Sequence, residues 1–240
     1  MTNHGSSRHI NRLAKSRAIP MPKKGAKWLI KASPGAHSKD ESIPLQVLIR
    51  DVLHLAEDAR EARRIIRTGE VLVDGKVRKK NDFAVGLMDV VVIPKAKKNY
   101  QIYRIGETLQ PVEISDESAK KKSCRIVNKT VVKGNKVQLN LHDGKNILIE
   151  KEEDRFRVGD TIIVTIPKYE IDHFIKLEKG TPCYVFKGKH AGAVGILDDV
   201  MEMPRGTPAD AKLKHEGEEL ITRKEYLLAV TKDFKVKEAK

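Results

Sequence analysis

The sequence predicts a mixed α+β, multidomain chain, and three observations support this fold class. Apolar residues make up 40% of the 240 positions but aromatic residues only 5%, which favours several small cores over one large core. Residues 42–69 carry apolar side chains at helical spacing, whereas segments after residue 70 alternate apolar and polar residues as strands do. At this length, one large domain or two to three small ones are possible.

The charge of the chain points to an anionic partner. Lysine and arginine number 47 against 33 acidic residues, which gives a formal net charge of +14 and a pI of about 9.6. An extended polyanion is the natural partner of such a chain. An acidic protein or an anionic membrane surface fits the composition equally well, so charge alone does not identify the partner.

Several classes of protein do not fit the sequence. No run of about 20 apolar residues is present, so we expect no membrane span. Residues 1–31 lack the apolar segment of a signal peptide, and Cys124 and Cys183 are too far apart for a CxxC pair, so we expect a reducing cytoplasm. The eight histidines do not cluster at zinc spacing, and we expect no metal, no cofactor and no small-molecule substrate.

Residues 1–41 are predicted to form a basic N-terminal arm, since positions 1–39 hold nine lysines and arginines and no Asp or Glu. Such a segment buries too little apolar surface to fold alone, so it is either a solvated tail or an arm that orders along phosphates. Trp28 favours the arm, because a lone indole in a basic segment needs a stacking or packing partner. His37 lies in a Ser-Pro-Gly-Ala-His turn, where it either contacts a phosphate or caps a bend. The other candidate contacts are Arg8, His9, Arg12, Lys23, Lys24 and Trp28.

Residues 42–105 are predicted to form a compact module that begins with two helices. The first opens at Ser42 and Pro44 and has apolar residues at helical spacing. These positions are Leu45, Leu48, Ile49, Val52, Leu53 and Ala56. The second starts at Asp58, with Glu61 placed as in a capping box, and ends at Gly69.

One face of the second predicted helix is basic. Its four guanidinium groups recur at i, i+3, i+4 and i+7 and repel one another unless a polyanion neutralises them. A solvated face is the plainer alternative, but acidic partners on this helix are few. The residues concerned are Arg60, Arg63, Arg64 and Arg67.

The segment 71–78 is predicted to form a hairpin. Its alternating strand is broken by Asp74-Gly75, which is the strongest short hairpin signal, and a further strand follows at Val90–Ile93. The turn brings a group of cations beside the arginines of the preceding helix. These cations are Lys76, Arg78, Lys79 and Lys80.

The rest of the chain is predicted to be rich in strands. Residues 106–175 form a central β-rich domain, in which Val137, Leu139 and Leu141 alternate with polar residues. Lys145, in a turn of this domain, is a further candidate RNA contact. In residues 176–231, two strands with glycines at 188, 192 and 195 enclose a loop, which is either an RNA-contacting loop or a plain barrel turn. Residues 232–240 form a basic tail. The candidate contacts on the loop are Lys187, Lys189 and His190.

Two of these segments resemble known modules. The two helices, Gly69, the Asp74–Lys76 hairpin and Gly86-x-Met88-Asp89 resemble the small RNA-binding domain first named from bacterial ribosomal protein S4. That module also occurs in pseudouridine synthases and a tyrosyl-tRNA synthetase, so it indicates RNA without naming one. The glycine-containing strand–loop–strand near residues 183–197 resembles the KOW motif of small SH3-like β-barrels.

The order of the parts is more specific than any one part. Taken together, the arm, the S4-type module, the His-Asp-Gly-Lys-Asn turn at 142–146 and the KOW-like loop resemble the ribosomal S4e family of the archaeal and eukaryotic small subunit. The similarity covers about residues 5 to 230, and it favours an archaeal member. Ala84 stands where many members of the family have proline.

The resemblance implies a structural constituent of the small ribosomal subunit that is located in the cytoplasm, in the ribosome. Its implied partners are small-subunit (16S-type) rRNA and neighbouring ribosomal proteins, and it is not expected to form a homo-oligomer. The arm, the arginine face with its hairpin and the loop near residue 188 would then be three anchors on separate rRNA helices.

Two alternatives remain at the level of sequence. One is a non-ribosomal RNA-binding regulatory factor. The other is an RNA-modifying enzyme, but pseudouridine synthases need an aspartate in an Arg-Leu-Asp setting that this sequence lacks. We therefore expect no catalytic residue.

Overall fold

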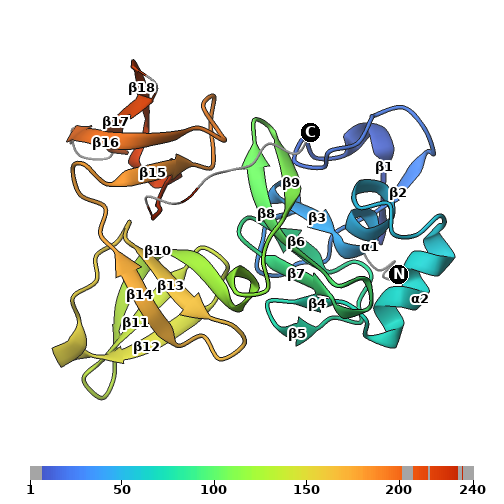
Figure 1. Ribbon diagram of the computed structural model, residues 1–240, viewed down its shortest axis with the longest axis horizontal. Helices are drawn as coiled ribbons and strands as arrows, with labels where there is room; N and C mark the ends of the chain where they lie inside the picture. Colours follow the sequence, from blue (N-terminus) through green and yellow to red (C-terminus); the bar gives the residue numbers. More distant parts are fainter. Residues whose placement is uncertain (1–6, 202–207, 216, 232–233, 235–240) are drawn as a thin grey trace, which may run out of the picture.

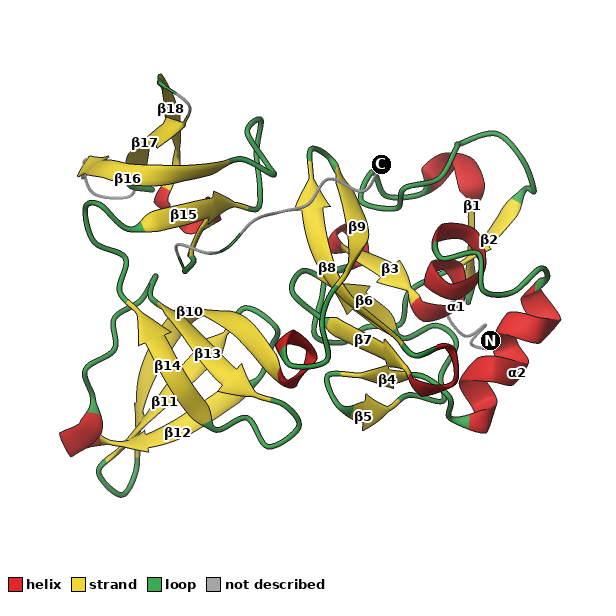
Figure 2. Cartoon of the chain, in the orientation of Figure 1, coloured by secondary structure: helices red, strands yellow, loops and turns green. Residues whose placement is uncertain are grey.

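The chain is organised around three five-stranded antiparallel sheets (Figures 1 and 2). The computed structural model describes residues 7–201, 208–215, 217–231 and 234. The predicted basic tail at 232–240 therefore lies, apart from Phe234, outside the described residues. The mixed α+β, multidomain class is confirmed in outline, with strands far more abundant than helices.

The N-terminal arm is folded onto the protein. Strand β1 (His9–Asn11) pairs antiparallel with β2 (Trp28–Ile30), and the segment between them buries Ala18 and Ile19 in the core beneath the helices. The Leu109 N–H donates to the Ala18 carbonyl at 2.8 Å, which ties the arm to a later strand. From residue 7 onward the arm is thus packed against the rest of the protein, whereas the sequence offered a solvated tail and an arm that orders along phosphates as the two alternatives.

The two predicted helices are present, but the first is shorter than its apolar pattern suggested. Ser42–Pro44 is strand β3, which pairs with β6 (Ala84–Gly86), so helix α1 (Leu45–Val47) begins later and continues as a π-helical turn, Leu48–Val52. Helix α2 (Ala59–Thr68) has the predicted ends. Asp58 Oδ1 accepts from the N–H groups of Arg60 and Glu61, and Gly69 ends the helix at φ 84°.

The first sheet continues the module that the helices begin. The hairpin turn Asp74-Gly75 has positive φ at both residues, 51° and 70°, as a two-residue hairpin turn requires. The sheet extends to Glu113, beyond residue 105 where the sequence placed the end of this module. Its order is β5-β4-β7-β8-β9, with bounds Lys76–Val77, Leu72–Val73, Val90–Ile93, Lys98–Ile105 and Thr108–Glu113.

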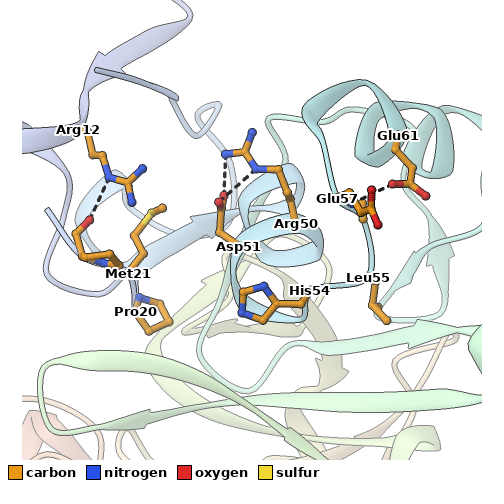
Figure 3. Close-up of a pocket in the computed structure, with 11 residues that line it drawn as sticks. Arg12, Pro20, Met21, Arg50, Asp51, His54, Leu55, Glu57 and Glu61 are labelled. Atoms are coloured by element: carbon orange, nitrogen blue, oxygen red, sulfur yellow. Dashed lines mark hydrogen bonds and ion pairs between the residues drawn. The ribbon is translucent and has the colours of Figure 1, made fainter. Parts of the chain in front are cut away.

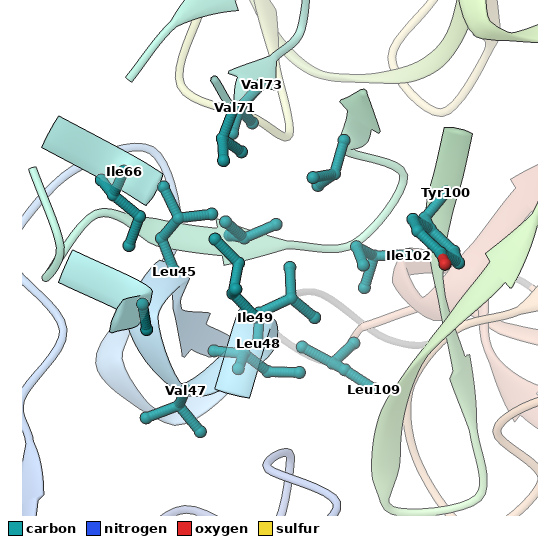
Figure 4. Close-up of a cluster of buried hydrophobic side chains, with 14 of the residues drawn as sticks. Leu45, Val47, Leu48, Ile49, Ile66, Val71, Val73, Tyr100, Ile102 and Leu109 are labelled. Carbon is teal, nitrogen blue, oxygen red and sulfur yellow. The ribbon is translucent and has the colours of Figure 1, made fainter. Parts of the chain in front are cut away.

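One apolar core joins this sheet to the helices and the arm. Leu45, Leu48 and Ile49 from the first helical segment pack with Ile66 of α2 and Ile102 of β8, all fully buried (Figure 4). Burial of such side chains stabilises the fold by about 1.5–3 kcal/mol each, so the core fixes α2 against the sheet. The opposite face of α2 is left in solvent.

The second sheet is the predicted central β-rich region. Val137, Leu139 and Leu141 are buried and Gln138 and Asn140 lie on the outer face, so the predicted alternation is confirmed. The sheet order is β12-β11-β10-β13-β14, with bounds Asn146–Glu150, Lys136–Leu141, Lys121–Val132, Thr161–Thr165 and Ile171–Ile175.

The third sheet contains the strand–loop–strand unit. Gly188 and Gly192 both have positive φ in the loop between its first two strands. The Tyr184 hydroxyl accepts from the Arg104 N–H at 2.8 Å, which joins this sheet to β8. The sheet order is β18-β17-β16-β15-β19, with bounds Glu218–Arg223, Asp210–His215, Val194–Met201, Pro182–Val185 and Leu227–Ala229.

Short 3₁₀ turns complete the regular structure. They are Arg12–Ala14, Lys39–Glu41, Pro94–Ala96, Ser118–Lys120, Lys151–Glu153 and Lys224–Tyr226. Within the described ranges, every helix is too short or too polar to cross a membrane. Those same ranges also contain no group of three or more His, Cys, Asp or Glu side chains arranged to hold a metal ion.

Candidate nucleic-acid interface

The exposed face of α2 is a surface of unpaired positive charge. Ala62 and Ile66 point into the core, and the four predicted arginines lie on the outside around an open hollow of about 440 Å³. In the part of the chain that the structure describes, the arginines paired with carboxylates are Arg17, Arg50 and Arg223. We call the α2 surface the arginine face; its residues are Arg60, Arg63, Arg64 and Arg67.

The predicted hairpin cations lie next to the arginine face. A Cβ placed on Gly69, at the end of α2, would be 3.5 Å from Lys79 Cε, so Lys79 reaches the last turn of the helix. Lys76 and Lys80 are also exposed. Arg78 is half-buried with its guanidinium 4.4 Å from the Phe83 ring centroid, so it contributes to packing as well as to charge.

A cleft of about 610 Å³ separates the arm hairpin from the helices. Arg8, His9 and Trp28 line it from the arm, and Arg63 and Arg67 line it from α2. We call it the arm cleft. The arm and the arginine face, which are two of the three predicted RNA contacts, therefore line the same cleft. They are more than thirty residues apart in the sequence, which gave no indication of this.

A larger hollow beside the arm is not a basic site. It has a volume of about 1040 Å³ and lies between Pro20–Pro22 and the connection from α1 to α2 (Figure 3). Arg50 is bound through two hydrogen bonds to Asp51, and Glu57 and Glu61 line the other side. Arg12, predicted to bind nucleic acid, faces this hollow and its Nε donates to the Pro22 carbonyl at 3.0 Å. The charges here are largely balanced within the protein.

Two predicted contact residues serve the fold instead. The side chain of His37 is only 6% exposed, its Nε2 lies 3.0 Å from Asp89 Oδ2, and its ring packs on Gly86, where a Cβ would come within 2.3 Å. This burial favours the alternative that His37 caps a bend and argues against the predicted RNA contact. Lys145 is mostly buried, with Nζ 2.8 Å from Asp74 Oδ2 and over the Tyr169 ring. Its positive charge is therefore paired with a carboxylate of the protein.

The remaining candidates are on the surface but are separate from the arm cleft. Lys23 and Lys24 are exposed in the arm. In the third sheet, Lys189 is exposed, His190 is half-buried and Lys187 forms an ion pair with Glu41 at 2.7 Å. The loop packs on the β8–β9 turn, since the Gly106 N–H donates to the Ala191 carbonyl at 2.9 Å.

A buried ionic cluster joins the first two sheets. Lys122 of β10 is fully buried, and its Nζ lies 2.8 Å from Asp74 Oδ2, 2.6 Å from Asp89 Oδ1 and 3.1 Å from Asp143 Oδ2. Asp74 lies in the turn between β4 and β5, and Asp89 directly precedes β7, so both come from the first sheet. Asp143 follows β11 of the second sheet. This cluster was not predicted from the sequence, although the strand parity that Lys122 shares with the buried Cys124 indicates an inward-facing lysine.

Comparisons with known proteins agree on one family. The model of an S4 domain matches residues 43–91, and that of ribosomal family S4e matches residues 96–171. The protein named small ribosomal subunit protein eS4 from Methanocaldococcus jannaschii is 42% identical over 241 residues, covering 96% of each chain. The protein of the same name from Ignicoccus hospitalis is 39% identical, covering 95% of this chain and 93% of its own.

This chain belongs to ribosomal family S4e. A solved structure, the 30S ribosomal protein S4e from Thermoplasma acidophilum, is similar with a TM-score of 0.69 and 30% identity, over 81% of this chain and 97% of its own. The relatives are archaeal, as the sequence favoured, and nothing in their names indicates a catalytic function. In this S4e chain, the buried cluster spans the two matched regions, since Asp74 and Asp89 lie in the S4 match and Lys122 and Asp143 in the S4e match.

The electrostatics of the cluster keep Lys122 and Asp89 charged. Burial alone would lower the pKa of Lys122, but Asp89 and Asp74 raise it well above the usual value. Burial alone would raise the pKa of Asp89, but Lys122 and His37 hold it well below its usual range. Burial and the nearby Lys122 lower the pKa of His142 from 6.5 to about 4, so this imidazole is neutral in the folded protein.

The neutral His142 predicts a loss of stability in mild acid. Above pH 6.5 His142 is neutral both folded and unfolded, but between pH 6.5 and about 4 only the unfolded chain takes up the proton. The free energy of unfolding should therefore fall by about 3 kcal/mol across this interval. Urea unfolding at several pH values measures it, with His142→Asn as the matched variant without a titrating ring. An equally steep acid dependence in His142→Asn would contradict the assignment.

Proposed function

We propose that this chain is a structural constituent of the small ribosomal subunit, located in the cytoplasm within the ribosome, that binds and scaffolds small-subunit rRNA. The observation that carries the proposal is the group of arginines shared by the arginine face and the arm cleft, on an S4 domain, which form no ion pair within the described residues. Arginines in this arrangement release counterions from RNA phosphates, which supplies most of the affinity in such complexes.

Each part of the chain is proposed to have its own role. The arm (1–41) and the S4-type module (42–105) hold the main RNA surface, and the central domain (106–175) positions that module through the Lys122 cluster. The part from 176 to 231 is proposed to be a KOW-type barrel, whose loop at Lys187, Lys189 and His190 makes a second contact. Support comes from its strand–loop–strand form and the two positive-φ glycines.

Recognition is proposed to rest on the shape of folded rRNA. The deep major groove of an A-form helix is closed to side chains, so phosphates, 2′-hydroxyls and unpaired bases are the groups available. The proposed partners are 16S-type rRNA and neighbouring small-subunit proteins, and catalysis is no part of the proposed role. The names of the relatives support this assignment.

Cosedimentation and crosslinking test the proposal together. The tagged full-length protein should sediment with small subunits at one copy each, and ultraviolet crosslinks in cells should concentrate at a few sites on small-subunit rRNA. Substoichiometric association, with crosslinks spread over messenger RNA or tRNA, would instead indicate a free regulatory factor.

A further inference from the structure

The arm cleft combines an aromatic platform, arginines without an ion pair and amide groups without a hydrogen-bond partner among the described residues. Its volume of about 610 Å³ is within the range of about 300–1,000 Å³ that is usual for sites of small ligands. Its walls come from two segments that are distant in sequence, the arm hairpin and the helices of the S4 domain. A surface that binds only phosphates would not need such a hollow. The side chains that line the cleft therefore indicate which further part of the RNA it recognises.

Trp28 is the aromatic platform of the cleft. The Trp28 residue is 53% exposed, which is unusual for tryptophan, although β2 holds its backbone in register with β1. The His9 ring packs edge to face with it, with ring centroids 4.7 Å apart, and Lys27 Nζ lies 5.2 Å from its centroid. An indole that is held in place, surrounded by cations and left open is the arrangement on which nucleic-acid bases stack.

The lining of the cleft includes a hydrogen-bond donor and an acceptor from two side-chain amides. The Gln46 residue is 4% exposed, and its Oε1 accepts from Asn81 Nδ2 at 3.1 Å and from Arg63 Nε at 3.4 Å. These bonds leave Gln46 Nε2 and Asn81 Oδ1 without a hydrogen-bond partner among the described residues. A donor and an acceptor that line the same cleft suit the edge of a base, which carries both kinds of group.

The charged groups of the cleft suit the backbone around such a base. Arg8, Arg63 and Arg67 line the walls and form no ion pair within the described ranges, whereas Arg50 is taken up by Asp51. The cleft also contains one carboxylate, that of Asp82, which can accept a hydrogen bond from an exocyclic amine but disfavours a phosphate beside it. Phosphates therefore belong on the arginine side and the base on the Trp28 side.

We propose that the arm cleft holds one unpaired nucleotide of the bound RNA. Its base stacks on Trp28, its edge meets Gln46 and Asn81, and the adjoining phosphates lie on Arg63 and Arg67. This inference rests on the proposed RNA-binding function and deepens it. It also means that the arm and the S4 domain grip one continuous stretch of RNA rather than two separate helices.

Tryptophan fluorescence of the full-length protein tests the inference directly, because Trp28 is the single tryptophan in the sequence. Hexa-adenylate should quench the emission saturably, whereas a blunt duplex of the same length and inorganic polyphosphate should not, since neither offers an unpaired base.

Trp28→Ala should weaken hexa-adenylate binding about 10-fold and Trp28→Phe much less, because a phenyl ring still stacks. Arg67→Gln should weaken it as well, and the matched Arg17→Gln, on an exposed arm arginine paired with Glu107, should not.

The outcomes separate this inference from the proposed function. Absence of quenching by hexa-adenylate, equal quenching by polyphosphate, or saturable quenching by hexa-aspartate alone would each overturn the nucleotide site. If the same protein still cosediments stoichiometrically with small subunits, the proposed function stands while the inference fails. Loss of both would remove the proposed function itself.

Discussion

Replacing Lys122 with methionine is expected to lower the free energy of unfolding by about 3–5 kcal/mol. The substitution keeps an unbranched side chain of similar length but removes the cation that faces Asp74, Asp89 and Asp143. Three carboxylates would then share a buried site with Lys145 as the remaining cation near Asp74 and Asp143. A loss of this size is a large part of the roughly 5–15 kcal/mol that stabilises most folded domains.

The neighbouring residue supplies a matched control. Lys121 carries the same side chain on the same strand, but its ion pair with Asp172 at 2.7 Å is exposed. Solvent screens such a pair, so Lys121→Met should cost less than about 1 kcal/mol. Urea unfolding followed by circular dichroism gives the free energy of unfolding of each variant. Equal losses would show that the buried Lys122 cluster stabilises the fold no more than an exposed ion pair does.

A double substitution separates lost attraction from uncompensated charge. In Lys122→Met, much of the penalty comes from carboxylates that remain charged and unpaired in a buried site. Adding Asp89→Asn removes one of these charges, while the amide oxygen can still accept from the Gly86 N–H that donates to Asp89 at 2.9 Å. The double variant should therefore be more stable than Lys122→Met alone, and further destabilisation would contradict this account.

The features predictable from the sequence are those whose signal is local. Asp58 and Gly69 mark both ends of α2, because an N-cap and a left-handed C-cap depend on one or two neighbouring residues. The Asp74-Gly75 turn and the alternation at 137–141 are equally local. The exposed arginine face follows from helix periodicity alone, once the apolar stripe is assigned.

The features that sequence could not supply depend on partners far apart in the chain. Lys122 is 48 residues from Asp74 and 33 from Asp89, and no local pattern specifies such a pairing. The packing of the arm, which brings Trp28 to Arg63, is of the same kind. His37 illustrates the consequence, since a histidine in a basic arm suggested RNA until the fold placed it against Asp89.

Neutralising the arginine face is expected to weaken binding to small-subunit rRNA by two orders of magnitude or more in moderate salt. The variant changes all four arginines to glutamine, a good helix former, so α2 should remain folded. Each phosphate contact contributes about −0.7 (single strands) to −0.9 (duplexes) to the slope of log affinity against log salt. Loss of four contacts should therefore flatten this slope by about 3 to 4. The substitutions are Arg60→Gln, Arg63→Gln, Arg64→Gln and Arg67→Gln.

A control of equal net charge decides whether position or total charge matters. Four exposed cations that already pair with carboxylates lie away from the arginine face, and their replacement by glutamine also lowers the net charge of +14 by four. These residues are Arg17, Lys121, Lys179 and Lys214. Filter binding between about 50 and 200 mM salt should leave the slope of this control within about one of the unmodified protein. Equal losses in both variants would mean that the chain binds RNA by its net charge, and that the order of arginines on α2 has no part in recognition.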